Sequence, residues 1–440
     1  MQRRLSGFIR RATNPSGAKR WLGKGFWAIM DQGLFAVSNF ALNIMLARWL
    51  TPTDYGAFSV AYTLFLLFGT FHTALLTEPM LVFGPGKYKE RFRDYLGVLL
   101  RGHWRFGVAI GLVFVLAGSV LWVLESSLAP AIFVLAAASP FVFFQWLMRR
   151  ACYVTLQPHF AAYAGVLYMV LMLGGLFGLY YYGVLNAVTG LGIMAFASLG
   201  SGLWLVRQLS VPRAPKKASE LMRVSMRDHW NYGQWALGTA VLTWVPGNAF
   251  LLLLPTWWGL EASGTYRAML NLLLPMMNVT TALGTVLLPA LVKQKAKGGF
   301  RGLTLRLTLL FMVAPVIYWL LLGGFGEPII RLLYGGKYLE YAHLLWLAAL
   351  IPVFAAAAAV SGAALRALEL PNKLFIAYAW STALTLTVGL ALVYLQGVSG
   401  ALLGWLLAYI VTTGVLTLLL LRNLDKDTEH RTPVPGNEGL

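Results

Sequence analysis

LQPHFAAY at residues 156–163 returns in altered form as ELPNKLFIAY at residues 369–378, with Pro158 aligned to Pro371. Three further matches keep the same order along the chain: Pro140 with Pro352, residues 181–190 with 394–404, and residues 55–58 with 263–266. The offset between matched positions drifts only from 208 to 214 residues. Four matches in one order indicate that the second half of the chain repeats the first.

The composition around this repeat is that of a membrane protein. Mean hydropathy is +0.68, 58% of residues are hydrophobic and only 12% are charged. A helix that crosses a bilayer needs roughly 20 mostly apolar residues. We therefore predict an all-α polytopic membrane protein with about twelve transmembrane helices, at 25–49, 57–82, 95–122, 129–152, 160–181, 184–206, 232–254, 263–291, 302–323, 341–365, 373–394 and 398–421.

Six helices in each repeat is an even number, so both halves enter the membrane in the same direction. Parallel repeats of this kind are related by an axis along the membrane normal and occur in transporters that work by alternating access. The pattern predicts a two-lobe transporter with a central cleft. A structural or scaffolding membrane protein is the alternative.

The basic residues give the predicted topology an orientation. With the N-terminus in the cytoplasm, only four of the 35 Lys and Arg residues fall on the outer side, namely Arg48, Arg267, Arg331 and Lys337. Cytoplasmic loops retain Lys and Arg, so both termini are expected in the cytoplasm. The formal charge of +19 follows this topology, and it therefore does not indicate nucleic-acid binding.

The same pattern predicts the division of the chain into segments. Residues 1–24 form a cytoplasmic arm whose apolar and basic residues suit a helix on an anionic membrane surface. The predicted segments after it are an N-lobe at 25–206, a cytoplasmic linker at 207–231, a C-lobe at 232–422 and a cytoplasmic tail at 423–440.

Polar residues inside the predicted spans indicate where a substrate could bind. They are costly in a bilayer and normally face protein or water. Helical spacing places them in stripes on three helices: Gln32, Asn39 and Asn43; Gln234 and Asn248; and Arg267, Asn271 and Asn278. We expect these stripes to line one water-filled cavity. For each Asn, hydrogen bonding between helices is the alternative.

A cluster of charges is predicted near the cytoplasmic mouth. Asp31, Glu78, Arg101 and Arg105 all lie roughly 8–15 Å from that face when depth is counted at 1.5 Å per residue. The cluster is either a structural ion-pair network or a gate that responds to H⁺ or Na⁺. His72, in the middle of its span, is a further candidate for proton coupling.

Arginines outnumber acids along the inferred path, which favours an anionic substrate such as a phosphate or diphosphate. Nothing in the pattern indicates an enzyme or a cofactor. The stretch GPGKY at 84–88 lacks phosphate-loop spacing, and the single Cys152 allows no internal disulfide. The longest external loop, predicted at 324–340, is too small for the site of a glycan polymerase or ligase.

The stretch SNFALNIMLARWLTPTDYGAFS at 38–59 resembles the opening of Wzx-type polysaccharide or O-antigen flippases, which belong to the multidrug/oligosaccharidyl-lipid/polysaccharide (MOP) exporter superfamily. EASGTYRA at 261–268 and LLYGGKY at 332–338 are similar to later segments of that family. Lipid II flippases of the superfamily usually have fourteen helices, and a count of twelve disfavours that branch.

The resemblance implies a V-shaped two-lobe fold in the bacterial inner membrane. It also implies translocation of an undecaprenyl-diphosphate-linked oligosaccharide from the cytoplasmic to the periplasmic leaflet, with a glycan polymerase and chain-length machinery as possible partners. Two alternatives remain open at this point. One is a cation-coupled multidrug exporter of the same superfamily, and the other is a polytopic glycan polymerase or ligase.

Overall fold

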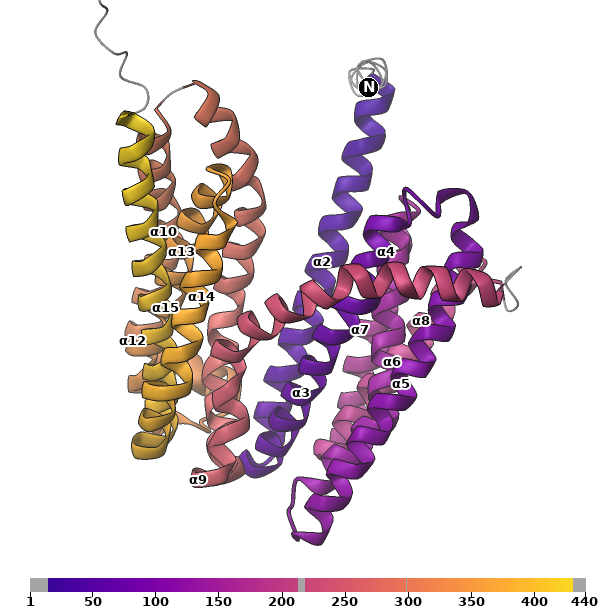
Figure 1. The fold of residues 1–440 in the computed structure, drawn as a ribbon. Helices are drawn as coiled ribbons and strands as arrows, with labels where there is room; N and C mark the ends of the chain where they lie inside the picture. The colour runs from indigo at the N-terminus through magenta and orange to yellow at the C-terminus, as the bar shows by residue number, and fades with distance from the viewer. Residues whose placement is uncertain (1–14, 213–217, 298, 430–440) are drawn as a thin grey trace, which may run out of the picture. The chain divides into compact units, whose positions relative to one another are not determined.

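The computed structural model of the protein describes residues 15–212, 218–297 and 299–429, and these residues form helices and turns only. The chain divides into two compact units, Met1–Ala240 and Val241–Leu440 (Figure 1). In this all-helical architecture every helix satisfies its own backbone hydrogen bonds, as a chain in a lipid bilayer must.

The first unit begins with a long helix and continues through five further spans. Pro52 and Pro158 each stand at the first turn of a helix, where a missing N–H costs nothing, and Thr51 and Asn186 cap helix N-termini with their side chains. The elements are α2 (Pro15–Trp49), α3 (Pro52–His72), the π-helix η1 (Thr73–Thr77), α4 (Glu78–Phe83), η2 (Lys89–Arg91), α5 (Phe92–Val123), α6 (Ala129–Val154), α7 (Pro158–Tyr181), α8 (Ala187–Gln208) and the start of α9 (Ala218–Lys297).

The second unit contains the rest of α9 and the elements after it. These are α10 (Phe300–Gly324), α11 (Gly326–Tyr334), η3 (Leu339–Leu344), α12 (Leu345–Ala348), α13 (Ile351–Ala367), α14 (Pro371–Leu384), the π-helix η4 (Thr385–Gly389) and α15 (Leu390–Glu429). The predicted external loop at 324–340 is therefore largely helical, because α11 occupies most of it.

The described residues contain ten helical segments long and apolar enough to cross a membrane. Two of them have 51 and 53 residues, Trp244–Gln294 and Asn372–Leu424, which at 1.5 Å per residue is more than twice the roughly 30 Å of a bilayer core. Each is interrupted by a glycine with left-handed φ, Gly259 at 74° and Gly397 at 57°. Each long segment therefore supplies two crossings, and the twelve predicted crossings are accounted for.

The internal repeat is visible in the backbone. α6 and α13 end at the equivalent C-caps Thr155 and Leu368, and the next residues, Leu156 and Glu369, both have positive φ, at 58° and 66°. Two residues further on, Pro158 starts α7 and Pro371 starts α14. The two helix ends also share one hydrogen-bond pattern, with Gln157 N–H donating to Cys152 O and Leu370 N–H to Leu365 O. The two repeats thus share one local turn design.

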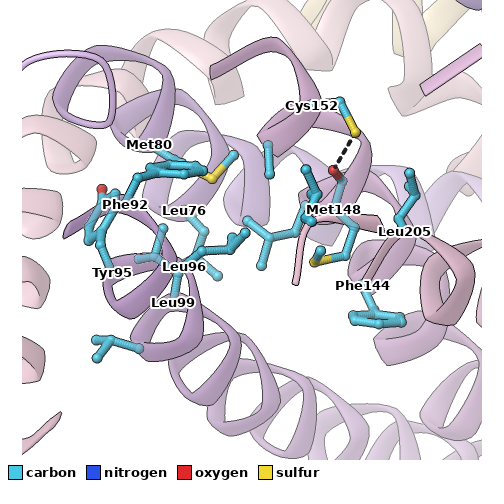
Figure 2. Close-up of a cluster of buried hydrophobic side chains, with 14 of the residues drawn as sticks. Leu76, Met80, Phe92, Tyr95, Leu96, Leu99, Phe144, Met148, Cys152 and Leu205 are labelled. Carbon is cyan, nitrogen blue, oxygen red and sulfur yellow. Dashed lines mark hydrogen bonds between the residues drawn. The ribbon is translucent and has the colours of Figure 1, made fainter. Parts of the chain in front are cut away.

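The core of the first unit lies at the end where α5 begins. Figure 2 shows its side chains, which come from η1 and α4, α5, α6 and α8. α6 is central: 61% of its most apolar stretch is buried, against 28% for α5. α6 is therefore largely enclosed by protein, whereas one face of α5 is open.

The linker predicted at 207–231 differs from the observed structure. α9 begins at Ala218, and the first compact unit extends to Ala240 rather than ending in the linker. This first part of α9 runs across the other helices of the unit (Figure 1), with Leu221, Ser225 and His229 buried at a spacing of four. Most of the predicted N-terminal arm, at 1–14, and most of the predicted tail, at 430–440, lie outside the described residues.

Two neighbouring residues of α9, Asp228 and His229, make polar contacts with the rest of the unit. The Lys87 ammonium and the Tyr88 hydroxyl donate to Asp228 Oδ2 at 2.6 and 2.5 Å. The His229 ring lies 2.9 Å from the Leu75 carbonyl oxygen and 2.5 Å from the Tyr95 hydroxyl. Burial alone would raise the pKa of Asp228, but the hydrogen bonds from Lys87 and Tyr88 outweigh it and lower that pKa.

Candidate functional site

A buried ion pair joins α2 to α6 inside the first unit. Arg149 Nε donates to Asp31 Oδ1 at 2.6 Å, and Arg149 Nη2 donates to the Asp31 carbonyl oxygen at 3.1 Å. The Tyr153 hydroxyl donates to the other carboxylate oxygen at 2.5 Å. The Asp31 side chain is fully buried. Arg149 and Tyr153 stand four residues apart on α6 and so reach the same carboxylate from one helix face.

A pocket of about 220 Å³ opens beside this ion pair. Three elements of the first unit line it, namely α2, η1 and α6. The lining residues are Gln32, Phe35, Thr73, Thr77, Trp146, Arg149, Arg150 and Tyr153. Thr73 and Thr77 are the first and last residues of the π-helix, a local departure from α geometry that is common at functional sites.

The lining of the pocket contains two arginines and no carboxylate. Asp31 neutralises Arg149, whereas no carboxylate in the described part of the chain forms an ion pair with Arg150. Arg150 is the exposed member of the arginine pair and lies within electrostatic range of Asp31 and Glu78. The pocket therefore combines the Arg150 guanidinium, which has no ion-pair partner among the described residues, with the hydroxyl of Thr73, and these donors suit a phosphate group. The Thr77 hydroxyl donates to the Thr73 carbonyl oxygen at 3.4 Å.

The structure does not bring together all the charges predicted at the cytoplasmic mouth. Glu78 is exposed on α4, and Arg101 and Arg105 are exposed on α5, so the partner of Asp31 is Arg149 instead. Counting residues from a helix end gives depth in the membrane, but it does not give the direction in which a side chain points. The role of Asp31 and Glu78 in gating stays a prediction.

His72 forms a buried pair with a histidine that the sequence places at similar depth. Its Nε2 lies 3.1 Å from Nδ1 of His103, and both side chains are fully buried. The His72 ring stacks on Phe143 with centroids 5.2 Å apart. Neither histidine lines the pocket at Arg150, and a part for His72 in ion coupling stays a prediction.

The asparagines of the first polar stripe connect helices. The Tyr62 hydroxyl donates to Asn39 and the Tyr55 hydroxyl to Asn43, each at 3.4 Å, while both amides donate back to their own helix. Of this stripe only Gln32 lines the pocket. The alternative of hydrogen bonding between helices thus describes the observed contacts of Asn39 and Asn43.

The other stripe residues lie in different surroundings. Arg267 and Asn271 are buried within the second unit, at 7% and 0% exposure, whereas Asn278 on the same helix is exposed. Asn248 donates to the Trp244 carbonyl oxygen at 3.0 Å, and the exposed Gln234 to that of Asn231 at 3.5 Å. A role for these five residues in substrate binding stays a prediction.

Sequence reasoning missed the residues that complete the pocket. Arg149 and Arg150 counted only as basic residues on the inferred path, and Tyr153, Thr73 and Thr77 were not singled out. The available signal was an arginine pair followed four residues later by a tyrosine, at the end of an apolar span and at the depth of Asp31. The spacing of Thr73 and Thr77 carried no signal, because nothing local distinguishes a π-helix from an α-helix in the sequence.

Residues 44–343 match the model of a family described as "Polysaccharide biosynthesis protein", and this stretch is more than half of the chain. The chain belongs to this family. Among the curated proteins with which the sequence was compared, none matches.

Solved structures share the fold of this polysaccharide biosynthesis protein. An inward-facing multidrug resistance transporter of the MATE family of the MOP superfamily matches with TM-score 0.75 and 13% identity, over 92% of this chain and 100% of that chain. The lipid II flippase MurJ in an inward closed conformation matches with TM-score 0.71 and 13% identity, over 92% and 87%. The resemblance to the MOP superfamily is thereby confirmed for the fold.

A third similar structure is a MOP superfamily transporter from Pyrococcus furiosus. Its TM-score is 0.62 and its identity 14%, over 92% of this chain and 96% of that chain. The family match and the shared fold make this chain a multi-pass membrane protein with the MOP transporter fold, in a family named for polysaccharide biosynthesis.

Proposed function

We propose that the protein is a flippase that moves an undecaprenyl-diphosphate-linked oligosaccharide from the cytoplasmic to the periplasmic leaflet of the bacterial inner membrane, with both termini in the cytoplasm. The observation that carries the proposal is the uncompensated Arg150 in a pocket of the first unit, in a chain of the polysaccharide biosynthesis family. The diphosphate is the common chemical feature of such carriers, and a guanidinium binds it well.

The pocket assigns distinct tasks to its two arginines. Arg149 is paired with Asp31, which also accepts a hydrogen bond from Tyr153, so Arg149 fixes the wall of the pocket and is not available to a substrate. Arg150 is free to approach a phosphate, and a close charge pair at an effective dielectric of 20 gains about 4 kcal/mol. Gln32, Thr73 and Thr77 add hydrogen-bonding groups around the same space.

The sign of the pocket argues against a cationic substrate. One similar structure in the MOP superfamily is described by the reverse polarity of its binding pocket and by a different function. Polarity therefore varies on this fold, and in this chain the charge left over at the pocket is positive. A lipid diphosphate fits that sign, whereas a cationic drug would be repelled.

The proposal is tested by deleting the gene and complementing it with variants. We expect the deletion to accumulate a lipid-linked oligosaccharide that stays inaccessible from the periplasmic face. Arg150→Gln should slow export at least about tenfold, corresponding to about 1.4 kcal/mol, while Arg150→Lys keeps more activity. Arg93→Gln, at an exposed arginine outside the pocket, is the matched control.

Several outcomes would overturn the proposal. Export at the wild-type rate by Arg150→Gln would remove the pocket from the pathway. Efflux of cationic dyes without any change in lipid-linked glycan would support the multidrug exporter. Joining of glycans by the purified protein would support a polymerase or ligase.

A further inference from the structure

An exposed face of α5 carries two arginines that have no acidic partner among the described residues. Arg101 and Arg105 are exposed on α5, and no carboxylate in the described ranges forms an ion pair with either. They follow the same helix face as the exposed apolar residues Val108, Leu112 and Leu116, at spacings of three and four. The exposed apolar residues of this face suit contact with lipid.

Arg101 and Arg105 lie in the half of α5 nearest its start, which is its cytoplasmic end under the predicted topology. Arg101 is nine residues from the start of α5 at Phe92, which is roughly 14 Å along the helix. A charged side chain at such a site extends toward the membrane surface or pairs with an opposite charge, because burying it alone in hydrocarbon is costly.

The first part of α9 supplies a second wall beside them. A Cβ on Gly102 of α5 would lie 3.3 Å from Met226 Sδ, so the two helices touch next to Arg101. The opposite flank of α9 is held by Asp228 against Lys87 and Tyr88, in the turn before α5. Met226 therefore lies on the flank of α9 that contacts α5 at Gly102.

The residues on this flank suit a membrane interface. Arg223 and Trp230 lie three residues before and four after Met226, which places them on the same side of α9. Both are exposed, and Trp230 is 56% exposed. Tryptophan is enriched at the boundary between headgroups and acyl chains, and arginine there attracts anionic lipids.

We propose that Arg101, Arg105, Arg223 and Trp230 form a binding site for the headgroup of an anionic phospholipid of the bilayer. Two or three guanidiniums would surround the phosphate from α5 and α9, with the indole at the interface beside it. Under the predicted topology the lipid lies in the cytoplasmic leaflet. The site is separate from the pocket at Arg150 and does not depend on the proposed function.

Charge complementarity determines the choice of occupant. The site has three positive groups and faces lipid, so a phosphate carried by a bilayer lipid is the anion present at highest concentration. Each basic residue near an anionic membrane surface contributes roughly a fivefold factor in binding. Removing two should therefore weaken binding of the lipid about 30-fold.

The test is equilibrium binding of a fluorescent phosphatidylglycerol to the purified full-length protein in neutral detergent. We expect Arg101→Gln with Arg105→Gln to weaken binding about 30-fold, and Arg101→Lys with Arg105→Lys to retain most of it. The matched control is Arg91→Gln with Arg93→Gln, two exposed arginines at the same end of α5. They lie outside the proposed site, so a local site predicts a change in binding of less than about twofold, whereas a diffuse surface charge predicts a loss like that of the Arg101 and Arg105 variant.

Three results would contradict the proposed phospholipid site, and each would indicate a different explanation. An equal loss in the Arg91 and Arg93 control would show a diffuse positive surface instead of a site. Equal affinity for phosphatidylcholine would show that charge is not recognised. A polyprenyl diphosphate could bind more tightly than phosphatidylglycerol and lose this binding in the Arg101→Gln with Arg105→Gln variant. That result would assign the site to the transported lipid and overturn the phospholipid assignment.

Discussion

The last turns of α6 and α13 hold equivalent positions in the two repeats but differ in chemistry. The offset of 213 residues that relates their C-caps pairs Arg149 with Gly362 and Arg150 with Ala363. In the first unit this turn carries a buried ion pair and lines a pocket. In the second unit it packs into an apolar core with residues of α15 such as Leu416.

The difference shows that the repeated backbone alone does not create the pocket at Arg150. Both turns end in the same hydrogen-bond pattern and lead into a helix that begins with proline. The side chains differ at several positions of the turn, among them Arg149 and Gly362, Arg150 and Ala363, and Tyr153 and Arg366. In the first repeat the turn forms a buried ion pair and a pocket wall, whereas in the second Gly362 and Ala363 let helices pack closely and the charge is at Arg366.

The largest expected effect comes from making the first unit resemble the second. Arg149→Ala would leave Asp31 buried without its partner, which typically costs about 3–5 kcal/mol of stability. We expect a large drop in the thermal unfolding temperature of the purified protein. The double variant Asp31→Leu with Arg149→Ala should recover most of the loss, and a double variant no more stable than the single one would contradict this account.

Tyr153→Phe sharpens the comparison by removing one hydrogen bond and leaving the ion pair. The hydroxyl donates to a buried carboxylate, so its loss should cost about 1.5–3 kcal/mol. The same melting experiment measures it. Tyr163→Phe, on the neighbouring α7 with its hydroxyl in no hydrogen bond among the described contacts, is the matched control and should melt as the wild type does.

The contact at His229 extends the comparison to a site outside the membrane-spanning segments. Burial lowers the pKa of His229 to about 4, and the opposing effects of the Leu75 carbonyl and of Asp228 are smaller. Because this pKa is lower than in the unfolded chain, near 6.5, stability is complete above pH 6.5 and falls as the pH drops toward 4.

At pH 5 the loss at His229 is up to about 2 kcal/mol. Hydrogen–deuterium exchange in residues 218–235, corrected for intrinsic rates, should therefore increase between pH 6.5 and 5. The variant His229→Gln should lack this increase. An unchanged pH response in that variant would assign the effect to another group, with Asp228 the next candidate.

A smaller effect is expected at an exposed ion pair of the same length. Lys87 and Asp228 approach to 2.6 Å, as do Arg149 and Asp31, but the Lys87 side chain is 50% exposed. Exposed pairs contribute about 0–1 kcal/mol. We expect Lys87→Ala to shift the melting temperature far less than Arg149→Ala, and equal shifts would show that burial does not set the difference.

The smallest effect is expected at Gly362 itself. A Cβ there would meet Leu374 at 3.8 Å and Leu416 at 4.0 Å, which is ordinary contact, so Gly362→Ala should change stability by no more than about 1 kcal/mol. Gly202→Ala in the first unit is the contrast, since its Cβ would lie 2.6 Å from Phe144. A large loss of stability in Gly362→Ala would show that the last turn of α13 tolerates substitution as poorly as the last turn of α6.

The sequence by itself determined the architecture of this protein. Apolar spans, the repeat and the turn residues before Pro158 and Pro371 predict twelve crossings in two halves, and the glycine breaks at Gly259 and Gly397 bear this out. These features are local or periodic, because hydropathy depends on composition over one span and a turn depends on a few residues. The resemblance at 38–59 likewise sufficed to indicate the superfamily.

Only the tertiary structure decided which polar groups meet. Asp31, Arg101, Arg105 and Arg149 share a depth that the rise of a helix gives directly, yet Asp31 binds Arg149 while the other two arginines are exposed on α5. The direction in which each side chain points depends on how every helix is rotated against its neighbours. Packing of distant segments sets that rotation, and the spacing of residues along one helix does not contain it.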